Sequence, residues 1–568
     1  MPRLIFSLTA FLIATLALPM ATRAQTDSVQ TLSTQAGVVV SDSPVASAVG
    51  AAVLKDGGNA VDAAVATAFA MAVTWPEAGN IGGGGFMLVA SPTGDPRFFD
   101  YRETAPAAST VDMYTPGENR HRARHAGTPG TVAGLWLAHE ELGTETWPTL
   151  VQPAIDLARD GFAIDQALAD SMNAMLHDEE TQPSGELAEL RRVFGKPGDG
   201  DWQEGDVLKQ PDLARTLERI RDRGRVGFYQ GDTAQTLETF MKASDGIMTA
   251  RDLADYRAVA RTPIHSKLRG YDVYGAPPPS SGGISVALIL NQIQNFPLEN
   301  GDRHGRFTTH MIAEAMRRAF FWRALRLGDP DHNEELDIDR LLSGSFAAYL
   351  CNSINPRIAS KSNLDDIYHY SDSGQHTTHF SVIDANGMAV ANTYTLEESW
   401  GSRVVVPGLG FVLNNEMGDF NWVAGRTTEQ GAIGTRPNLI EPGKRMLSSM
   451  SPTIVKKDGK VVLVTGSPGG RTIINTVACI VLNRLMWNMS PADAVDAPRM
   501  HHQWMPDTLY LEEFDGVEAL AGELIEMGHD VKVRPAQGSA HSIFVDGETG
   551  EVTAVVDRRR GGGASAGE

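Results

Sequence analysis

The sequence has little cysteine, lacks the short motifs that bind zinc, and shows no strand-to-helix elbow that would activate a serine. Of its 568 residues only Cys351 and Cys479 are cysteines, far apart, and we expect two free thiols rather than a disulfide. Because no Cys-x-x-Cys or His-Glu-x-x-His is present, nothing supports a zinc site, and we expect no metal and no other cofactor. We find no Gly-x-Ser-x-Gly elbow between a strand and a helix, because the match at residues 563–567 falls in the expected C-terminal tail, and a serine nucleophile of that kind has no support.

Basic residues are also scarce. The chain has 49 lysines and arginines against 70 acids, which gives a formal net charge of −21. Nucleic acids and anionic membrane surfaces attract proteins through basic patches. We therefore expect neither nucleic acid nor a membrane as a partner.

Long apolar runs are absent after the N-terminus. Residues 4–18 are apolar, follow Arg3 and precede a small-residue cleavage site at 22–24. This pattern predicts a secretory signal peptide over residues 1–24, with an apolar run too short to cross a bilayer comfortably. Its removal takes away two arginines and no acids, so that 47 bases face 70 acids. We expect an exported protein, periplasmic or secreted.

The remaining residues exceed the usual size of one hydrophobic core. The first part, rich in Ala and Gly, predicts helices at 45–54 and 60–73, a glycine run at 82–85 and a strand at 86–90. Short strands mixed with helices in the last third predict stacked layers of helix and sheet. We also expect helices at 311–327 and 473–487, strands at 378–383, 388–395, 461–465 and 542–545, and a disordered tail from about residue 561.

A β-hairpin in the last third places two threonines together. The turn DANG at 384–387 favours a three-residue loop with Gly387 in the left-handed conformation. Counting back along both strands then puts Thr377 opposite Thr395 on one face. A two-residue turn would instead set Thr377 opposite Leu396. Threonine is also a good strand former, so the pair taken alone favours cross-strand stabilisation over a catalytic role.

Several motifs distinguish between these readings, because together they resemble the γ-glutamyltransferases of the N-terminal nucleophile hydrolase superfamily. The resemblance runs from about residue 35 to 555, with the motifs in the right order. Thr-Thr-His alone would be a weak signal, whereas the set is highly specific. The motifs are GGGG at 82–85, DYRETAP at 100–106, PPPSSGG at 277–283, TTH at 377–379, NNEMGDF at 414–420, LSSMSPT at 447–453, TGSPGG at 465–470 and HHQW at 501–504.

The resemblance implies a fold and a processing event. The expected fold is α+β, a four-layer αββα sandwich formed by two subunits cut from one precursor. Cleavage between His376 and Thr377 would give a large subunit of residues 25–376 and a small catalytic subunit of residues 377–568, together a heterodimer. The freed α-amine has a reference pKa of about 7.7 to 8.0, so Thr377 would carry both the nucleophile and its base.

The resemblance also assigns supporting roles. Thr395 would hydrogen-bond and orient the Thr377 hydroxyl. Gly469 and Gly470 lie between an expected strand and an expected helix, where their amides can stabilise an oxyanion at the helix N-terminus. A tight turn between strand and helix would have the same geometry.

A γ-glutamyl donor presents an α-carboxylate and an α-ammonium, and both charges need partners in a pocket. Arg102, Ser448 and Ser449 match the family's carboxylate-binding positions. The acids that match its ammonium-binding positions are Glu397, Glu416 and Asp419. The expected substrates are glutathione and related γ-glutamyl amides, with water or an amino-acid or dipeptide amine as acceptor.

The chain departs from many relatives in two places. Glu397 replaces a usual asparagine, which makes the pocket more negative and could raise the pKa of one acid. The stretch 421–444 is long enough for the family's lid loop but contains no tyrosine, the aromatic gate of several members. Trp422 is a candidate replacement, although it lies early in the loop. Both departures bear on the balance between hydrolysis and transpeptidation.

Two other functions are compatible with parts of the sequence. A cephalosporin acylase of the same superfamily shares the motifs around Thr377 but cleaves a glutaryl side chain that has no ammonium, so the three retained acids favour the transferase. An uncleaved exported binding protein could use residues 82–85 as an anion-binding loop. Glycines in such a run more often permit close packing.

Overall fold

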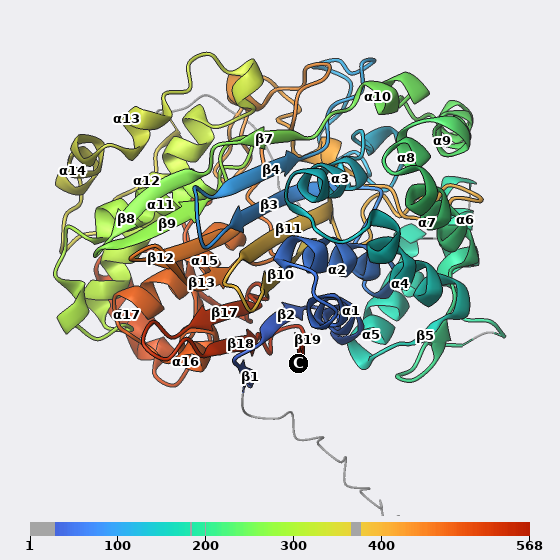
Figure 1. Ribbon diagram of the computed structural model, residues 1–568. Helices are drawn as coiled ribbons and strands as arrows, with labels where there is room; N and C mark the ends of the chain where they lie inside the picture. The colour runs from blue at the N-terminus through green and yellow to red at the C-terminus, as the bar shows by residue number, and fades with distance from the viewer. Residues whose placement is uncertain (1–28, 182–184, 199, 365–375, 568) are drawn as a thin grey trace, which may run out of the picture.

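The computed structural model describes residues 29–181, 185–198, 200–364 and 376–567, so the expected signal peptide lies outside the described residues. Two seven-stranded sheets pack against each other, and helices cover the outer face of each (Figure 1). The four layers therefore follow the order helix, sheet, sheet, helix. This arrangement confirms the expected α+β sandwich.

Every neighbouring pair in the two large sheets is antiparallel. The first sheet has the order β19 (Gly563–Gly567), β2 (Gly37–Ser41), β10 (His376–Ile383), β11 (Ala389–Glu397), β3 (Gly84–Ala90), β4 (Arg97–Tyr101) and β7 (Val259–Arg261). The second has the order β1 (Gln30–Thr34), β18 (Val552–Val556), β17 (Ser542–Val545), β13 (Lys460–Thr465), β12 (Thr453–Lys457), β9 (Tyr271–Gly275) and β8 (Ile264–Leu268). Smaller sheets comprise β5 (Phe162–Ala163) with β6 (Val207–Leu208), and β14 (Met500–His501), β15 (Leu509–Glu512) and β16 (Val531–Arg534).

The helices form two outer layers (Figure 1). Those on the first sheet and beyond it are α1 (Pro44–Lys55), α2 (Ala60–Thr74), α3 (Thr131–Leu142), α4 (Trp147–Asp160), α5 (Gln166–His177), α6 (Ala188–Phe194), α7 (Pro211–Arg223), α8 (Val226–Tyr229), α9 (Gly231–Ala243) and α10 (Ala250–Asp255). Those on the second sheet's side are α11 (Gly282–Ile293), α12 (Arg306–Arg326), α13 (Ile338–Leu342), α14 (Gly344–Asn352), α15 (Thr472–Leu485), α16 (Pro491–Asp496) and α17 (Val517–Glu526). Short 3₁₀ turns connect several of these elements.

Alternation along the strands builds two separate cores. In β2, Val39 faces the helices of the first layer, while Val38 and Val40 face the second sheet. Both faces are buried, which explains why this strand is apolar at every position rather than at alternate ones.

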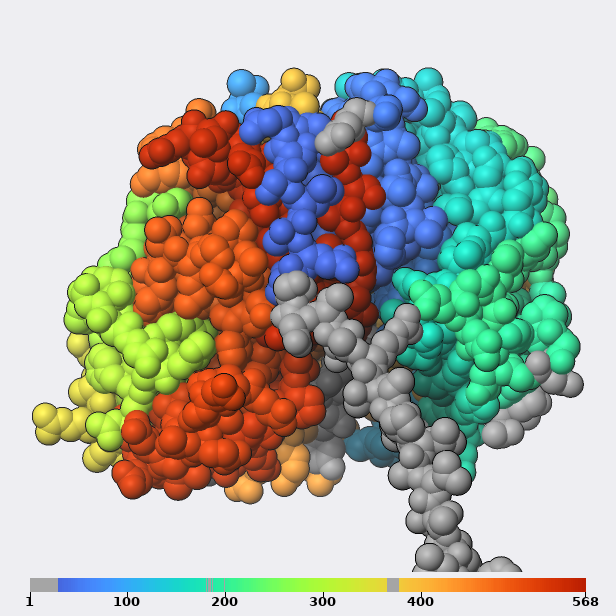
Figure 2. All heavy atoms as spheres, turned by 90° about the horizontal axis from the view of Figure 1, so that it is seen from below, coloured from blue at the N-terminus to red at the C-terminus, as the bar shows by residue number. Residues whose placement is uncertain are grey.

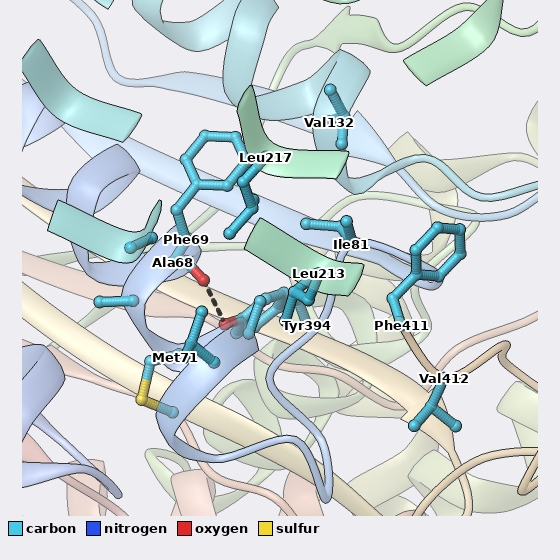
Figure 3. Packing of buried hydrophobic residues seen from close by; sticks show 14 of the residues in the cluster. Ala68, Phe69, Met71, Ile81, Val132, Leu213, Leu217, Tyr394, Phe411 and Val412 are labelled. Atoms are coloured by element: carbon cyan, nitrogen blue, oxygen red, sulfur yellow. Dashed lines mark hydrogen bonds between the residues drawn. The ribbon is translucent and has the colours of Figure 1, made fainter. Parts of the chain in front are cut away.

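Helix α2 is buried along its whole length, as its alanine-rich sequence allows. Asn59 and Asp62 form a reciprocal capping box at its N-terminus. Tyr394 of β11 inserts below the helix and donates a hydrogen bond to the carbonyl of Ala68 across 3.0 Å (Figure 3). The polar end of a buried tyrosine is thereby satisfied inside the apolar cluster that surrounds Phe69.

The hairpin of β10 and β11 has the register that its turn predicts. Gly387 has φ +86°, and the Asp384 amide donates to the carbonyl of Met388 at 2.9 Å. The three-residue loop is therefore correct and the two-residue alternative is wrong. Regular pairing continues back to residue 378, with one irregularity between 376 and 378. The strands thus bring Thr377 beside Thr395.

The C-terminal tail corrects a prediction. We expected disorder from about residue 561, but Gly563–Gly567 forms β19 and pairs with β2. Figure 2 shows C-terminal atoms in red lying against N-terminal atoms in blue. Small residues are required there, since a Cβ on Gly563 would lie 2.9 Å from Pro44. The strand is held by backbone pairing, which a sequence without apolar periodicity does not reveal.

Two expectations about the whole chain have simple outcomes. Cys351 and Cys479 are free thiols, the first half-buried and the second buried. Within the described ranges, no helix has both the length and the apolar character needed to cross a bilayer.

Candidate active site

Thr377 lies at the start of β10 and is 5% exposed. Its hydroxyl donates to the hydroxyl oxygen of Thr395 across 3.4 Å, and that oxygen also accepts the backbone N–H of Glu397 at 2.9 Å. The Glu397 amide holds the Thr395 hydroxyl in place, and the Thr395 hydroxyl in turn restrains the position of the Thr377 oxygen. His376 begins the same strand, but its side chain and residues 365–375 lie outside the described residues.

Gly469 and Gly470 form the turn between β13 and α15. Their φ angles are +127° and +55°, and a Cβ on Gly469 would lie 2.5 Å from Thr472 Oγ1. Among the described residues, neither glycine amide donates to an acceptor. Two unpaired amides next to the N-terminus of a helix form an anion-binding position.

Arg102 is buried at the centre of a cluster of acids. Its guanidinium contacts Glu416 at 2.7 Å, Asp419 at 2.5 Å and Glu103 at 3.5 Å. Burial lowers the pKa of a guanidinium, but the charges of Glu416, Glu103 and Asp419 raise the pKa of Arg102 above its ordinary value. The expected carboxylate-binding residue is thus paired with two of the acids expected to bind the ammonium. A zwitterionic ligand would exchange these internal pairs for its own charges.

Glu397, the departure from the family pattern, has its own partner. Arg120 contacts its carboxylate at 2.9 Å and also lies 4.9 Å from the ring centre of Trp422. Burial raises the pKa of Glu397, and Arg120 partly offsets this shift. The additional carboxylate is therefore accompanied by an additional cation, a pairing that the sequence did not indicate.

Unsatisfied carboxylate oxygens suit this pocket to an ammonium. Oε1 of Glu416 and Oε2 of Glu397 have no hydrogen-bond partner among the described residues, whereas Oε2 of Glu416 lies 2.7 Å from Arg102. An ammonium supplies three donors and would satisfy such acceptors. Glu103, which we did not predict as part of the site, likewise has no hydrogen-bond partner for Oε1 among the described residues, while its Oε2 lies 3.5 Å from Arg102.

The two serines line the cavity, and each hydroxyl oxygen accepts one hydrogen bond. Ser448 Oγ accepts the amide of Met450 at 3.1 Å, and Ser449 Oγ accepts Nη2 of Arg323 at 3.0 Å. Because each oxygen already accepts a bond and donates none within the described residues, its hydrogen remains available for an anionic ligand. The PPPSSGG motif supports this loop, since Ser281 donates to the carbonyl of Ser448 at 2.6 Å.

These groups surround one cavity of about 660 Å³, a volume that includes its open mouth. Of the predicted site residues whose side chains the structure describes, all except Gly469 line it. The wall also contains Arg323 and Arg471, which were not predicted. The predicted residues that line it are Thr377, Thr395, Gly470, Arg102, Glu397, Glu416, Asp419, Ser448 and Ser449.

The stretch 421–444 covers one side of the cavity, but none of its residues that line the cavity is aromatic. Trp422 donates its indole N–H to the carbonyl of Met417 at 2.8 Å and packs on Tyr114 at 4.8 Å between ring centres. It does not line the cavity, so it does not replace the gating tyrosine of several family members. The loop residues that line the cavity are Asn421, Ile433, Thr435 and Asn438.

The glycine run at 82–85 is packed against neighbouring backbone. A Cβ on Gly83 would lie 2.1 Å from the carbonyl of Thr395, and one on Gly82 would lie 2.2 Å from that of Val412. Carbonyl oxygens repel anions. The run therefore permits close packing of β3 beside the site and does not form an anion-binding loop.

One buried cluster has residue types that bind metals. The ring nitrogens of His310 and His529 are hydrogen-bonded to each other at 2.8 Å, and Glu314 accepts from Arg318 at 2.6 Å and from Ser360. Apart from Nδ1 of His529, which has no partner among the described residues, these atoms are occupied by protein partners, and two arginines lie beside Glu314. We interpret the cluster as a structural hydrogen-bond network.

Replacing Arg102 tests the pocket. We expect Arg102→Ala to raise the KM for a γ-glutamyl donor about tenfold to a hundredfold, because a charge-assisted hydrogen bond contributes about 1.5–3 kcal/mol. Steady-state kinetics on the cleaved protein provide the measurement. Arg102→Lys keeps the buried charge and should show a smaller increase. An unchanged KM in Arg102→Ala would refute the assignment.

Glu103 predicts a pH dependence of stability. Burial raises the pKa of Glu103 to about 8, although Arg102 opposes the shift. The folded protein therefore retains a proton that the unfolded chain releases near pH 4.5, and stability falls as pH rises through this window, on the order of 1 kcal/mol per unit. Glu103→Gln should make the slope shallower in urea unfolding between pH 5 and 8, and the part that remains belongs to other buried acids with a raised pKa, such as Glu397. A slope equal to that of the wild type would contradict the prediction.

The fold and the site together define a class. Two facing sheets between helical layers, with a threonine near the start of a central strand beside a glycine turn whose amides are unpaired, characterise the N-terminal nucleophile hydrolases. Residues 46–567 match the family model described as Gamma-glutamyltranspeptidase. The chain therefore belongs to the gamma-glutamyltranspeptidase family and is an enzyme.

Individual relatives agree with this membership. The glutathione hydrolase proenzyme of Escherichia coli (strain K12) is 42% identical over 534 residues, which cover 92% of this chain and 90% of that protein. The gamma-glutamyltranspeptidase of Helicobacter pylori is 38% identical with a TM-score of 0.53, covering 56% of this chain and 91% of that one. The cephalosporin acylase of Bacillus halodurans has a TM-score of 0.84 over 98% of this chain and 100% of its own, but at 24% identity it shares the fold alone.

Proposed function

We propose that the protein is a self-processing γ-glutamyltransferase and glutathione hydrolase. It cleaves γ-glutamyl amides through a Thr377 ester and passes the acyl group to water or to an amine. One observation carries the proposal: the Thr377 hydroxyl lies 3.4 Å from that of Thr395, in a cavity that Gly470 and the acid cluster also line. The similarity to a relative named glutathione hydrolase proenzyme supports the substrate class.

Processing comes first. The Thr377 hydroxyl attacks the carbonyl of His376, the peptide C–N bond breaks, and the acyl group moves to oxygen as an ester. Water then hydrolyses the ester, which leaves a carboxyl group on His376 and a free α-amine on Thr377. The two fragments are a large subunit of residues 25–376 and a small subunit of residues 377–568.

The arrangement of the strands supports a stable heterodimer after this cut. In the first sheet, β10 and β11 of the small subunit lie between β2 and β3 of the large subunit. In the second, four central strands from the small subunit lie between β1 and β9 of the large subunit. Separation of the subunits would break backbone pairing in both sheets.

Catalysis then uses the new terminus. The α-amine of Thr377 takes the hydroxyl proton as the oxygen attacks the γ-carbonyl of the donor. The amides of Gly469 and Gly470 stabilise the resulting oxyanion. As the C–N bond breaks, the same α-ammonium returns the proton to the leaving amine. Water or an acceptor amine releases the acyl group by the reverse sequence.

The glutamyl end of the donor binds in the charged part of the cavity. Its α-carboxylate binds Arg102 and the hydroxyls of Ser448 and Ser449, and its α-ammonium binds the acids around Glu416, including Asp419 and Glu397. These steps require no cofactor. On the sequence pattern of residues 1–24, we further propose that the protein is exported to the periplasm or secreted.

A chromogenic γ-glutamyl anilide tests the activity. We expect turnover, with a faster release of the chromophore when glycylglycine is added as acceptor. A glutaryl anilide, which lacks only the ammonium, serves as the matched control and should be turned over at least tenfold less efficiently, because a buried acid cluster left without its cation is costly. Equal or better turnover of the glutaryl compound would favour an acylase.

A further inference from the structure

The second threonine of the TTH motif is held from the other side of β10. Thr378 is completely buried, and its hydroxyl donates to Oδ2 of Asp42 at 2.6 Å. Asp42 directly follows β2 and is 2% exposed. A residue on the N-terminal side of the cleavage site thus binds the residue next to the nucleophile.

The other oxygen of Asp42 is also occupied. Its Oδ1 accepts Nε2–H of His541 at 2.9 Å and the hydroxyl of Ser539 at 3.3 Å. The tautomer of His541 is fixed, because its Nδ1 accepts the backbone N–H of Asp557. Although burial raises the pKa of Asp42, His541 and Thr378 lower it below the ordinary value, so the carboxylate is ionised.

The same carboxylate is connected to the oxyanion turn. The amide of Ser539 donates to Ser467 Oγ at 3.1 Å, and Ser467 donates to the carbonyl of Pro468 at 2.7 Å. Ser467 and Pro468 directly precede Gly469. Asp42 therefore contacts the strand of the nucleophile directly, and the loop that carries the unpaired amides through Ser539.

We propose that Asp42 is a positioning residue that fixes the new N-terminus against the oxyanion turn after cleavage. The inference rests on the proposed function. Once the bond before Thr377 is cut, the strand begins at the nucleophile, and a terminal residue frays unless it is tied down. The charge-assisted hydrogen bond from Thr378 to Asp42 restrains the chain one residue after the nucleophile. Without it the Thr377 hydroxyl would move, and a displacement of about 1 Å in a reacting group can lower the rate a hundredfold.

Substitutions of Thr378 and Asp42 test the proposal with γ-glutamyl anilide kinetics, normalised to the cleaved fraction measured by intact mass. Thr378→Val keeps the shape and removes the hydroxyl; we expect kcat to fall at least tenfold while the donor KM stays within threefold. Asp42→Asn should show the same fall in kcat, because the carboxylate accepts from Thr378, His541 and Ser539 with two oxygens, whereas an amide has only one oxygen that can accept. Thr378→Ser retains the hydroxyl and should stay within threefold of the wild type.

Asp384→Asn is the matched control at the opposite end of β10. Asp384 is also buried, and like Asp42 and Thr378 it takes part in a hydrogen bond between the two expected subunits, because its carboxylate accepts the amide N–H of Ala60 at 3.1 Å. It does not line the cavity. We expect a lower unfolding midpoint and an unchanged kcat.

Three results would overturn the role of Asp42. They are a wild-type kcat in Thr378→Val or Asp42→Asn, an equal loss of kcat in Asp384→Asn, and no rescue by Thr378→Ser. If Thr378→Val does not fold, Asp42→Asn and Thr378→Ser decide. A wild type without cleavage or turnover would instead refute the proposed function itself.

Discussion

Thr377→Ala is expected to remain a single polypeptide and to release no chromophore from a γ-glutamyl anilide above the background rate. The substitution removes the only atom that forms a bond in both processing and catalysis. Loss of a covalent nucleophile typically costs a factor of about ten thousand or more. Denaturing gel electrophoresis and the anilide assay provide the two measurements.

Thr377→Ser is the control for this substitution. Serine keeps a hydroxyl and, after cleavage, an α-amine, so this variant should form two fragments and retain measurable activity. Cleavage of Thr377→Ala at the same bond, or its activity at the level of Thr377→Ser, would contradict the assigned role.

Gly469→Ala is expected to lower kcat about a hundredfold to a thousandfold, the usual cost of losing one donor to an oxyanion. Gly469 has φ +127°, a conformation that an alanine avoids, and its Cβ would lie 2.5 Å from Thr472 Oγ1. The turn must shift, and the amides then point away from the reacting carbonyl. The donor KM should change much less, because the turn does not hold the glutamyl group.

Gly459→Ala controls for the backbone effect of that substitution. Gly459 also has a positive φ, +81°, but nothing lies within 4 Å of the position of its Cβ, and it is absent from the cavity wall. We expect reduced stability with kcat unchanged. A kcat for Gly469→Ala within threefold of this control would argue against an oxyanion role for the turn.

Local sequence rules were sufficient to predict the parts of the site whose position is set by the backbone geometry of a turn. The turn at 384–387 set the hairpin register and hence the contact of Thr377 with Thr395. Glycines between a strand and a helix likewise indicated the turn at Gly469, whose positive φ only glycine adopts readily. Such features depend on neighbours within a few residues.

These local rules could not predict contacts between residues that lie far apart in the sequence. Arg120 pairs with Glu397 across 277 residues, and nothing in its surrounding sequence marks it. The ion pairs of Arg102 with Glu416 and Asp419 were also not predicted, because the family pattern describes contacts to a ligand rather than contacts among the pocket residues themselves. The missed strand β19 has the same cause, since its pairing with β2 depends on the folded chain.

Intact-mass spectrometry of the purified wild-type protein, performed on the sample whose γ-glutamyl turnover has been measured, tests the central claim most directly. We predict two polypeptides, of which the smaller begins at Thr377 and ends with the C-terminus. A fully active sample that contains only one continuous polypeptide would contradict the account, because no α-amine would then be present at the nucleophile.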